Sequence, residues 1–594
     1  MNSKHTLTWF VITVALFAFI FTYHYFERPA APASLEILPG LRLASVTSVQ
    51  VIPNDAPEIS AVRTNNEWIL TQPVFYPAQK VAIEGLAGEL QKLKAAYPPI
   101  NTGGKQDADS EYGFKTPTTI VVQSGDDRRE ILVGNRTPPG DQVFLRVVGS
   151  DGVYVTDAGW LKFIPQSAND WRDVSLAGSV EDYGSIVLTN GTKIIELHSD
   201  PTNHLWEMTR PLAARANGDY IVKALQQLQT ARVSQFVTDN SNADMTAFGL
   251  QPADLDLWLG NGSNFVTGVH FGKNSTNDST LVYAKREGWN AIVTTPKQPL
   301  APWYGTVNDF RDPYLFELTA PVMEIDMIGP GTNHYVLQRV DANTWTIPGE
   351  KFPVDPGSVQ YLIQALAGLH ISEFVKDVVT PADLPGYGLA QPRRQIILRS
   401  ATGDTNAVMA DLLFSDVSTN GVFVKRTDED FIYAISAEDY GKLPEGGGWQ
   451  FRQHYIWNFS ETNIAEITIR QNGKMIRIIH NGPNQWSPAN GSQGIINAPA
   501  VEEVAHDLGN LYSDAWMGYG PTTPTGFGIK PDGLSITLTL KDGESYTVDF
   551  GAVLPGANTT YAAVTLDGER WVFLFPPGLY QMVASYLVIP VNVP

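Results

Sequence analysis

The chain contains no cysteine in its 594 residues. This absence excludes disulfide bonds, thiolate catalysis and sulfur-rich metal sites, but it does not identify the compartment, because an oxidising space permits disulfides without requiring them. Basic residues are also scarce: 41 Lys and Arg stand against 62 Asp and Glu, and no basic run is longer than Arg393-Arg394. Nucleic-acid binding normally needs a basic stripe, so nucleic acid is not expected as a partner.

The sequence also lacks the usual signatures of catalysis. Its ten histidines are scattered, none has the four-residue spacing of helical zinc ligands, and His198 and His204 are the nearest pair after the N-terminal segment. No Gly-x-Ser-x-Gly motif is present, and Gly446-Gly447-Gly448 is not followed by the Lys-Ser/Thr of a phosphate loop. We therefore predict no enzymatic activity and no catalytic, metal-binding or cofactor-binding residue. Ligand-binding residues and oligomeric state stay unknown at this stage.

One long apolar run opens the chain. Leu7–Phe26 contains no Lys, Arg, Asp or Glu, and about twenty residues at about 1.5 Å each match a hydrocarbon core of about 30 Å. We predict an uncleaved transmembrane anchor over residues 1–28 and a linker over residues 29–40. A cleaved signal peptide is the alternative, because small residues follow at Ala30–Ser34, but its apolar region is usually only about 7–15 residues long.

Charges at the two ends of this run predict its orientation. Lys4 and the terminal amine precede it, and only Arg28 follows it, so the positive-inside rule favours a cytoplasmic N-terminus. Trp9, Tyr23 and Tyr25 stand where interfacial aromatic side chains are common. The expectation is a single-pass protein of the inner (cytoplasmic) membrane, with the bulk of the chain periplasmic or otherwise extracytoplasmic.

One set of landmarks occurs four times. Each copy has a tryptophan after a β-like run, then a proline, an amphipathic helical pattern and, about forty residues after the tryptophan, an aromatic-Gly-hydrophobic triplet. The tryptophans are Trp68, Trp206, Trp345 and Trp486, and the triplets begin at Tyr112, Phe248, Tyr387 and Phe527. The period of about 140 residues predicts four tandem repeat domains. Their boundaries are 41–177, 178–319, 320–460 and 461–594.

Each predicted domain combines one helix with many strands. Asp355 before Pro356, Asn497 before Pro499, and Asp219 are expected near helix starts. The expected buried faces are Val81, Leu86, Leu90 and Leu93; Val222, Leu225 and Leu228; Val359, Leu362, Leu366 and Leu369; and Val501, Val504, Leu508 and Leu511. Four short β-like runs follow each glycine triplet, separated by turn residues such as Asp542-Gly543. The predicted fold class is α+β: a mostly antiparallel sheet with one main covering helix in each domain, after the N-terminal transmembrane helix.

Three domains end in a short arginine motif: Trp171-Arg172-Asp173, Phe310-Arg311-Asp312 and Phe451-Arg452-Gln453. We expect each arginine to pair within its own domain rather than bind an anion. The repeated tryptophans are expected to be core residues, and the triplet glycines to have a positive φ. Each domain is expected to have its own core, with modest, partly polar interfaces and connections near Ala177, Thr319 and Ser460.

The order of these motifs resembles the domain of unknown function 4340 family. The resemblance rests on the tryptophan and proline, the Gly triplet, an aliphatic-Gly or aromatic-Gly pair (Val133-Gly134, Phe271-Gly272, Phe550-Gly551) and the arginine closure. Phe414-Ser415 departs from this pattern in the third domain, and the fourth domain has no arginine closure. The resemblance implies a bacterial membrane-anchored protein without an established activity, often encoded near ABC-type exporters and gliding-motility-like auxiliary subunits.

Two functions from different classes fit the sequence. The leading hypothesis is a non-enzymatic, membrane-anchored scaffold or accessory protein, with an ABC-type permease or auxiliary subunit of an export or envelope complex as partner. The alternative is an envelope enzyme or binding protein that acts on a cell-surface polymer at an inter-repeat cleft, where Trp160, Trp258, Trp303 or Trp516 would stack on sugar rings. An acid-lined and aromatic-lined cleft at one junction would favour the alternative.

Overall fold

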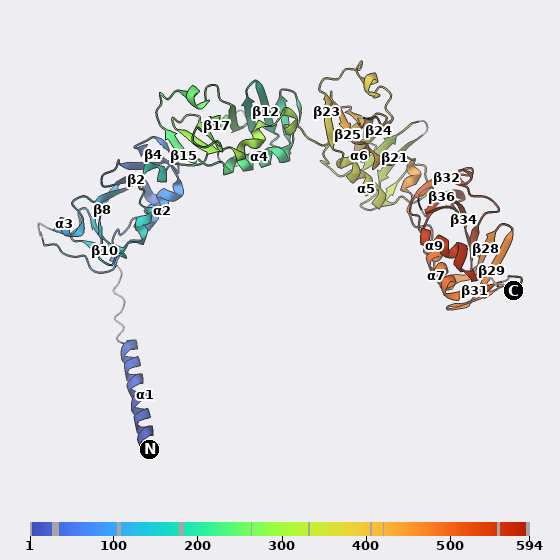
Figure 1. The fold of residues 1–594 in the computed structure, drawn as a ribbon, viewed down its shortest axis with the longest axis horizontal. Helices are drawn as coiled ribbons and strands as arrows, with labels where there is room; N and C mark the ends of the chain where they lie inside the picture. Colours follow the sequence, from blue (N-terminus) through green and yellow to red (C-terminus); the bar gives the residue numbers. More distant parts are fainter. Residues whose placement is uncertain are drawn as a thin grey trace. The chain divides into compact units, whose positions relative to one another are not determined.

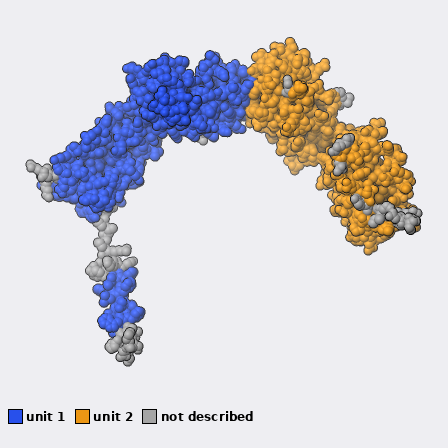
Figure 2. Space-filling model, in the orientation of Figure 1, with its two compact units in different colours: residues 1–311 blue, residues 312–594 orange. Residues whose placement is uncertain are grey.

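Most strands of the protein belong to four large antiparallel sheets (Figure 1). The computed structural model describes residues 3–26, 35–103, 108–177, 183–262, 264–330, 333–403, 407–419, 421–492, 494–554, 557 and 559–589. Two compact units, residues 1–311 and 312–594, each contain two of these sheets (Figure 2). We call each large sheet with its long helix a module and number the modules along the chain.

The first unit contains modules 1 and 2. Module 1 has the strand order β10-β9-β8-β7-β2-β3-β4-β5, and module 2 has the order β14-β13-β12-β11-β16-β17-β18-β19-β15. The elements of module 1 are β2 (Val46–Ile52), β3 (Ile59–Thr64), β4 (Glu67–Gln72), β5 (Tyr76–Pro77), α2 (Lys80–Gln91), α3 (Ala108–Tyr112), β7 (Thr118–Ser124), β8 (Asp127–Arg136), β9 (Gln142–Val147) and β10 (Tyr154–Asp157). Those of module 2 are β11 (Ser185–Asn190), β12 (Lys193–Ser199), β13 (Trp206–Arg210), β14 (Ala214–Arg215), α4 (Gly218–Thr230), β15 (Gln235–Thr238), β16 (Leu255–Asn261), β17 (Asn264–Asn274), β18 (Leu281–Arg286) and β19 (Ile292–Pro296).

The second unit contains modules 3 and 4. Their strand orders are β22-β21-β20-β24-β25-β26-β27-β23 and β30-β29-β28-β33-β34-β35-β36-β32. Module 3 comprises β20 (Glu324–Ile328), β21 (His334–Arg339), β22 (Trp345–Thr346), α5 (Pro356–Ala367), β23 (Ile371–Lys376), β24 (Arg394–Arg399), β25 (Val408–Phe414), β26 (Val422–Arg426), β27 (Ile432–Ile435) and α6 (Ala437–Gly441). Module 4 comprises β28 (Ile464–Gln471), β29 (Lys474–Gly482), β30 (Gln485–Pro488), α7 (Ala498–Gly509), β32 (Trp516–Tyr519), α8 (Thr523–Gly526), β33 (Ser535–Leu540), β34 (Ser545–Val553), β35 (Thr560–Leu566), β36 (Glu569–Phe575) and α9 (Pro577–Gln581).

The long helix of a module links opposite edges of its sheet. In modules 2 and 3 the strands before and after the helix are the two edge strands: β14 and β15, and β22 and β23. In module 4 the helix also lies between the edge strands β30 and β32, but the short strand β31 (Ile495–Ile496), which pairs with β37 (Val588–Ile589), comes between β30 and α7. The chain must therefore cross the whole sheet, and the helix makes this crossing over one face. Module 1 differs, because β6 (Lys94–Ala95) pairs with β1 (Leu35–Glu36) in a separate two-stranded ladder. The mixed, mainly antiparallel α+β architecture is as predicted, with shorter helices beside the long ones.

Most of the predicted helix starts and buried faces are present. Asp355 caps α5, since its carboxylate accepts a hydrogen bond from the Ser358 backbone N–H at 2.8 Å. The cap of α4 is Asn217 rather than Asp219, and it accepts from the Tyr220 N–H at 3.0 Å. Two predicted core positions were wrong. Val81 is 85% exposed and Val222 is 37% exposed, while Ile83 and Ile221 lie in the core instead. The predicted buried stripe began two residues too early in α2 and one residue too late in α4, and at about 100° per residue such shifts turn a side chain away from the core.

The four repeated tryptophans are core residues, as predicted. Their exposed fractions are 1% for Trp68, 8% for Trp206, 6% for Trp345 and 7% for Trp486. In modules 1 and 4 the indole N–H also points to a glutamate on the long helix: Trp68 Nε1 lies 3.3 Å from Glu84, and Trp486 Nε1 lies 2.5 Å from Glu502. The tryptophan therefore joins the sheet to the helix and satisfies its own polar atom.

The glycine motifs form matched pairs. Gly113, Gly249, Gly388 and Gly528 all have positive φ, between 69° and 82°. The second glycine of each pair lies at a β-bulge, marked by register shifts between Val133 and Arg136, Phe271 and Asn274, and Phe550 and Val553. A Cβ atom on Gly272 would clash with the carbonyl oxygen of Phe248, so the bulge needs glycine. In module 3, β25 and β26 pair without a register shift, and the Ser415 Oγ accepts a hydrogen bond from the Phe423 N–H at 3.0 Å.

The N-terminal segment forms helix α1 over Ser3–Phe26. Residues 8–22 are exposed along its length. Among the described residues, no helix is both long and apolar enough to span a bilayer. The side chains of Tyr23 and Tyr25, Arg28 and residues 29–34 of the predicted linker lie outside the described residues.

Candidate functional site

The three arginine motifs occupy equivalent places. Each follows a short 3-10 helix: Ala168–Asp170, Val307–Phe310 or Gly448–Phe451. The aromatic residue before the arginine accepts a backbone hydrogen bond from the N-cap residue of the module's long helix. These bonds are Gln79 N–H to Trp171 O at 2.7 Å, Asn217 N–H to Phe310 O at 2.9 Å, and Asp355 N–H to Phe451 O at 2.7 Å. Each motif is therefore fixed at the sheet edge where the helix begins.

The same segments also pair with the strand region that follows a helix further along the chain. Ser175 bridges Arg232, Tyr314 bridges His370, and Tyr455 bridges Tyr512. The arginines themselves form bridges to Ala78, Ala216 and Val354. Only two residues separate the two kinds of bridge in each segment, so we call residues 171–175, 310–314 and 451–455 the closing segments. Between modules 1 and 2, and between modules 3 and 4, the closing segment is therefore bridged to both modules.

Arg172 joins module 1 to module 2. Its guanidinium forms a two-pronged ion pair with Asp239, in which Nη1 lies 3.2 Å from Oδ2 and Nη2 contacts Oδ1. The guanidinium carbon lies 3.6 Å from the Phe236 ring centroid and 4.6 Å from that of Tyr76. Arg172 is only 2% exposed. The expectation that it pairs within its own domain was wrong, because its carboxylate partner belongs to the next module.

A second ion pair crosses the same junction in the opposite direction. Arg286 of β18 contacts Asp173 of the closing segment, with Nη1 and Oδ2 2.9 Å apart, and also approaches the Ser175 carbonyl oxygen at 3.3 Å. Burial raises the pKa of the Tyr76 phenol at this junction, and the two arginines partly offset that effect. Tyr76 packs edge-on against Trp289 at 5.6 Å. The junction therefore combines paired charges with an aromatic cluster.

Arg452 has the equivalent role between modules 3 and 4. It contacts Asp567 at 3.2 Å, and its guanidinium carbon lies 4.3 Å from the Trp571 ring centroid. Its carbonyl oxygen accepts a hydrogen bond from Trp516 Nε1 at 3.0 Å, and Phe352 packs edge-on against Trp571 at 5.3 Å. Burial lowers the pKa of the Arg452 guanidinium, and the ion pair with Asp567 opposes this shift. A different acid thus serves the same purpose at this junction.

Arg311 shares the local geometry of Arg172. It is 2% exposed, and its Nη1 lies 3.3 Å from the Asn308 side-chain oxygen, as Arg172 Nη1 does from Asn169. Sequence reasoning missed the carboxylates that such arginines use. A signal was available, because Phe236-Val-Thr-Asp239 is repeated as Phe374-Val-Lys-Asp377. Module 4 has Trp516-Met-Gly-Tyr519 at this place, without the acid.

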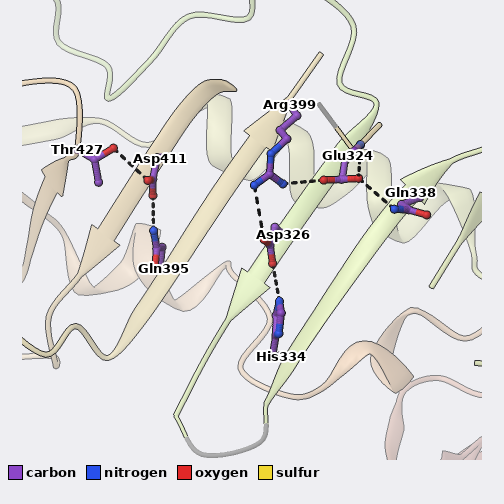
Figure 3. A network of polar contacts seen from close by, with 9 residues as sticks. Glu324, Asp326, His334, Gln338, Gln395, Arg399, Asp411 and Thr427 are labelled. Atoms are coloured by element: carbon purple, nitrogen blue, oxygen red, sulfur yellow. Dashed lines mark hydrogen bonds and ion pairs between the residues drawn. The ribbon is translucent and has the colours of Figure 1, made fainter. Parts of the chain in front are cut away.

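A second candidate is a polar network on the sheet of module 3 (Figure 3). Arg399 Nη1 lies 2.6 Å from Glu324, which is 4% exposed, and Nη2 lies 3.7 Å from Asp326. Gln338 donates to the other Glu324 oxygen at 3.0 Å, and His334 Nε2 lies 2.8 Å from Asp326. The Glu324 carboxylate is thus occupied on both oxygens, which suits a structural network better than a catalytic base. Within the described ranges, no group of three His, Asp or Glu side chains could hold a metal ion.

The four tryptophans of the alternative hypothesis belong to three modules: Trp160 to module 1, Trp258 and Trp303 to module 2, and Trp516 to module 4. Trp160 and Trp516 are buried, Trp303 is fully buried, and Trp258 is half-buried against Phe265 and His270. Stacking on a sugar needs an open ring face, which the three buried tryptophans do not offer.

His198 forms a side-chain contact with Ser185 at 3.3 Å, and His204 lies in a turn with a positive φ of 60°.

These features define a class: an α+β protein of antiparallel-sheet modules in which the two modules of each compact unit are joined through a closing segment and a buried arginine pair. The chain belongs to the family described as a domain of unknown function, DUF4340, whose profile matches residues 68–186, 206–351 and 345–532. The three matches start at Trp68, Trp206 and Trp345, which are repeated tryptophans of modules 1 to 3. No curated protein matches the chain.

Proposed function

We propose that this protein is a non-enzymatic scaffold or accessory protein with four tandem modules on a membrane anchor. Its modules would lie outside the cytoplasm and work with an export or envelope complex, such as an ABC-type permease and its auxiliary subunits. The anchor is supported by the exposed apolar side chains along α1, which include Trp9, Phe10, Phe17 and Phe21. The partner class rests on the family resemblance alone.

The observation that carries the proposal is the buried arginine junction. Arg172 and Arg452 each leave one module to pair with a carboxylate of the next, and aromatic rings enclose both guanidinium groups. A two-pronged Arg–carboxylate pair is directional, so it fixes orientation as well as proximity. Such joints hold neighbouring modules at a set angle. This property suits a protein that positions partners more than one that turns over a substrate.

The polymer-binding alternative has weaker support. A cavity of about 480 Å³ lies at the junction of modules 1 and 2, lined by Asp173, Ser175, Ala177, Gln229, Arg232, Thr267 and Arg286. Its two arginines and single acid differ from the acid-lined and aromatic-lined cleft that glycan chemistry would favour. Its Asp173 is already paired with Arg286. The cavity is therefore better explained as part of the joint.

Affinity purification of the full chain from detergent-solubilised membranes tests the proposal. We expect a membrane protein complex to be recovered in near-equal amount with the wild type and with Arg128→Ala, because Arg128 is an exposed side chain of β8 whose ion-pair partner, Glu130, belongs to the same strand. Asp239→Asn removes the charge that orients Arg172 and should reduce recovery several-fold while the protein stays folded. Recovery of the wild-type chain without any partner protein would contradict the scaffold proposal. Release of soluble fragments from envelope polymer by the purified protein would favour the alternative.

A further inference from the structure

Module 3 contains a cavity with two buried polar groups that have no partner. The cavity has a volume of about 320 Å³ and is lined by residues that include Tyr335 of β21, Arg394 of β24 and Tyr440 of α6. Arg394 is 8% exposed and Tyr335 is 9% exposed. Neither Arg394 Nη1 nor the Tyr335 hydroxyl has a hydrogen-bond partner within the described structure. The Arg394 guanidinium lies over the Tyr440 ring, with its carbon 5.2 Å from the ring centroid.

Both residues stand where the other modules have uncharged and mostly apolar residues. Tyr335 pairs with Met327 across the sheet, and the residues with the same pairing in modules 1, 2 and 4 are Ile59, Ile195 and Ile476. Arg394 lies two residues before Ile396, the other cross-strand partner of Met327. The equivalent residues are Thr118, Leu255 and Leu534. Module 3 alone therefore places a guanidinium and a phenol at these two positions, which are uncharged in the other modules.

Such a replacement is costly unless something pairs with it. A buried charge without a counter-ion destabilises a fold, commonly by several kcal/mol, and an unmade hydrogen bond of a buried hydroxyl costs about 1–3 kcal/mol. Arg172 and Arg452 avoid this cost because each is paired with a carboxylate. Arg394 has none among the described residues, and no ion pair or side-chain hydrogen bond involves it. The missing partner would be an anion that enters the cavity.

We propose that this cavity binds a small organic monocarboxylate. The carboxylate would accept hydrogen bonds from Arg394 Nη1 and from the Tyr335 hydroxyl. The acids at the cavity favour a single negative charge: Glu445 is exposed at the lining, and Asp416 is 3.7 Å from Arg393 and largely exposed. These two acids would repel a dianion such as phosphate more strongly than a monoanion. The cavity volume is at the lower end of the range for ligand pockets, so only a small ligand would fit.

The phenol is suited to donate in this site. Burial raises the pKa of Tyr335 well above its ordinary value, and the charge of Arg394 only partly opposes the shift. The hydroxyl therefore stays protonated at neutral pH and can donate to an anion. The inference does not depend on the scaffold proposal, because binding here needs neither a membrane partner nor the junctions between modules.

Titration calorimetry of the full chain in detergent would test the site with sodium acetate, sodium benzoate and sodium phosphate as separate probes. We expect saturable binding of at least one carboxylate with a Kd of about 1 mM or lower and no comparable binding of phosphate. Arg394→Leu installs the residue that module 2 has at this position. It should weaken carboxylate binding at least roughly tenfold.

Tyr335→Phe provides a second variant that keeps the ring. It should weaken binding roughly threefold to tenfold, and Arg128→Ala in module 1 should leave binding unchanged. Arg394→Leu should melt at the same temperature as the ligand-free parent or higher, because the unpaired charge is gone. Absence of carboxylate binding in the parent, equal binding of phosphate, or parent-like binding by both site variants would each overturn the proposal.

Discussion

Buried arginines in this chain are of two kinds, and the difference is their partners. Arg172 and Arg452 each have a carboxylate and aromatic rings around the guanidinium. Arg394 has an aromatic neighbour but no carboxylate among the described residues. A buried pair can be close to neutral for stability, whereas a buried lone charge is unfavourable. Arg172 and Arg452 therefore join neighbouring modules, whereas Arg394 is suited to bind a ligand.

Trp206 offers a direct test of the repeated core position. Trp206→Ala should destabilise module 2 by about 3–5 kcal/mol, because the ring is buried and truncation leaves a cavity. Chemical denaturation followed by circular dichroism would measure the change. Val81→Ala is the matched control, since this side chain is 85% exposed and its loss should change stability by no more than about 0.5 kcal/mol. A Trp206→Ala protein with parental stability would place the ring outside the core.

Asp383 should make part of the stability depend on pH. The Lys376 ammonium, 2.6 Å away, and hydrogen bonds from Thr380 lower the pKa of Asp383 to about 2. Because this pKa is lower in the folded chain than in the unfolded chain, the stabilisation is present above about pH 4 and is lost as the pH falls toward 2. The stability difference between the parent and Asp383→Asn should shrink over that range. NMR titration of the carboxyl carbon gives an independent check, and a midpoint near pH 4 would contradict the prediction.

At the scale of elements, matched glycines set the path of the chain at the bulges. Gly272→Ala should destabilise the protein by about 1–3 kcal/mol, because the new Cβ would clash with the Phe248 carbonyl oxygen and the backbone would have to move. Gly88→Ala in α2 is the control. No atom lies within 4 Å of its new Cβ, and alanine favours a helix interior over glycine by about 0.5–1 kcal/mol. Thermal melts should shift in opposite directions, and equal shifts would argue against a steric role for the bulge.

Helix α1 carries the prediction of topology. If Leu7–Phe26 anchors the chain with its N-terminus inside, residues from Pro29 onward should be digested when protease is added to intact spheroplasts. A cytoplasmic protein examined in the same cells should stay intact as the control. Protection of the chain until the cells are lysed would rule out this orientation.

The sequence predicted elements better than their phases. The spacing of apolar residues and the positions of turn residues were enough to predict the strands, the long helices and the antiparallel architecture. The phase of α2 was misjudged because Val81 and Ile83 are both apolar, and only packing decides which of them turns inward. The pairing of Arg172 with Asp239 lay further out of reach, since 67 residues separate them and no local pattern joins them. The repeated Phe-Val-x-Asp sequence was the one available sign.

At the scale of the whole molecule, the modules are less independent than the sequence suggested. The core of module 2 includes Tyr76 and Leu176, which come from module 1 and its closing region. The expectation of a separate core in each domain was therefore wrong for module 2. Size and repeat length could not reveal this, because they count residues without showing which surface each one covers.

Truncation tests this sharing. A fragment of residues 183–311 loses Tyr76 and Leu176, each of which contributes about 1.5–3 kcal/mol by burial, so it should melt at least roughly 10 °C below module 2 in a fragment of residues 35–311. Differential scanning calorimetry of the two fragments gives the comparison. Restoring residues 74–177 to the shorter fragment should recover the loss. Equal melting temperatures would show that module 2 has a self-sufficient core.

The closing segments have a consequence for how such a chain changes in evolution. Each closing segment forms two bridges, and two residues lie between them. In the first segment, Arg172 bridges Ala78 and Ser175 bridges Arg232. If the gene were duplicated between equivalent points of two closing segments, the new module would have one part of a closing segment at each end. Each part would match the part already present in the neighbouring module. Lengthening by recombination then needs no new linker. A single copy could then change without the others, and the third module does differ from the other three at Arg394 and Tyr335.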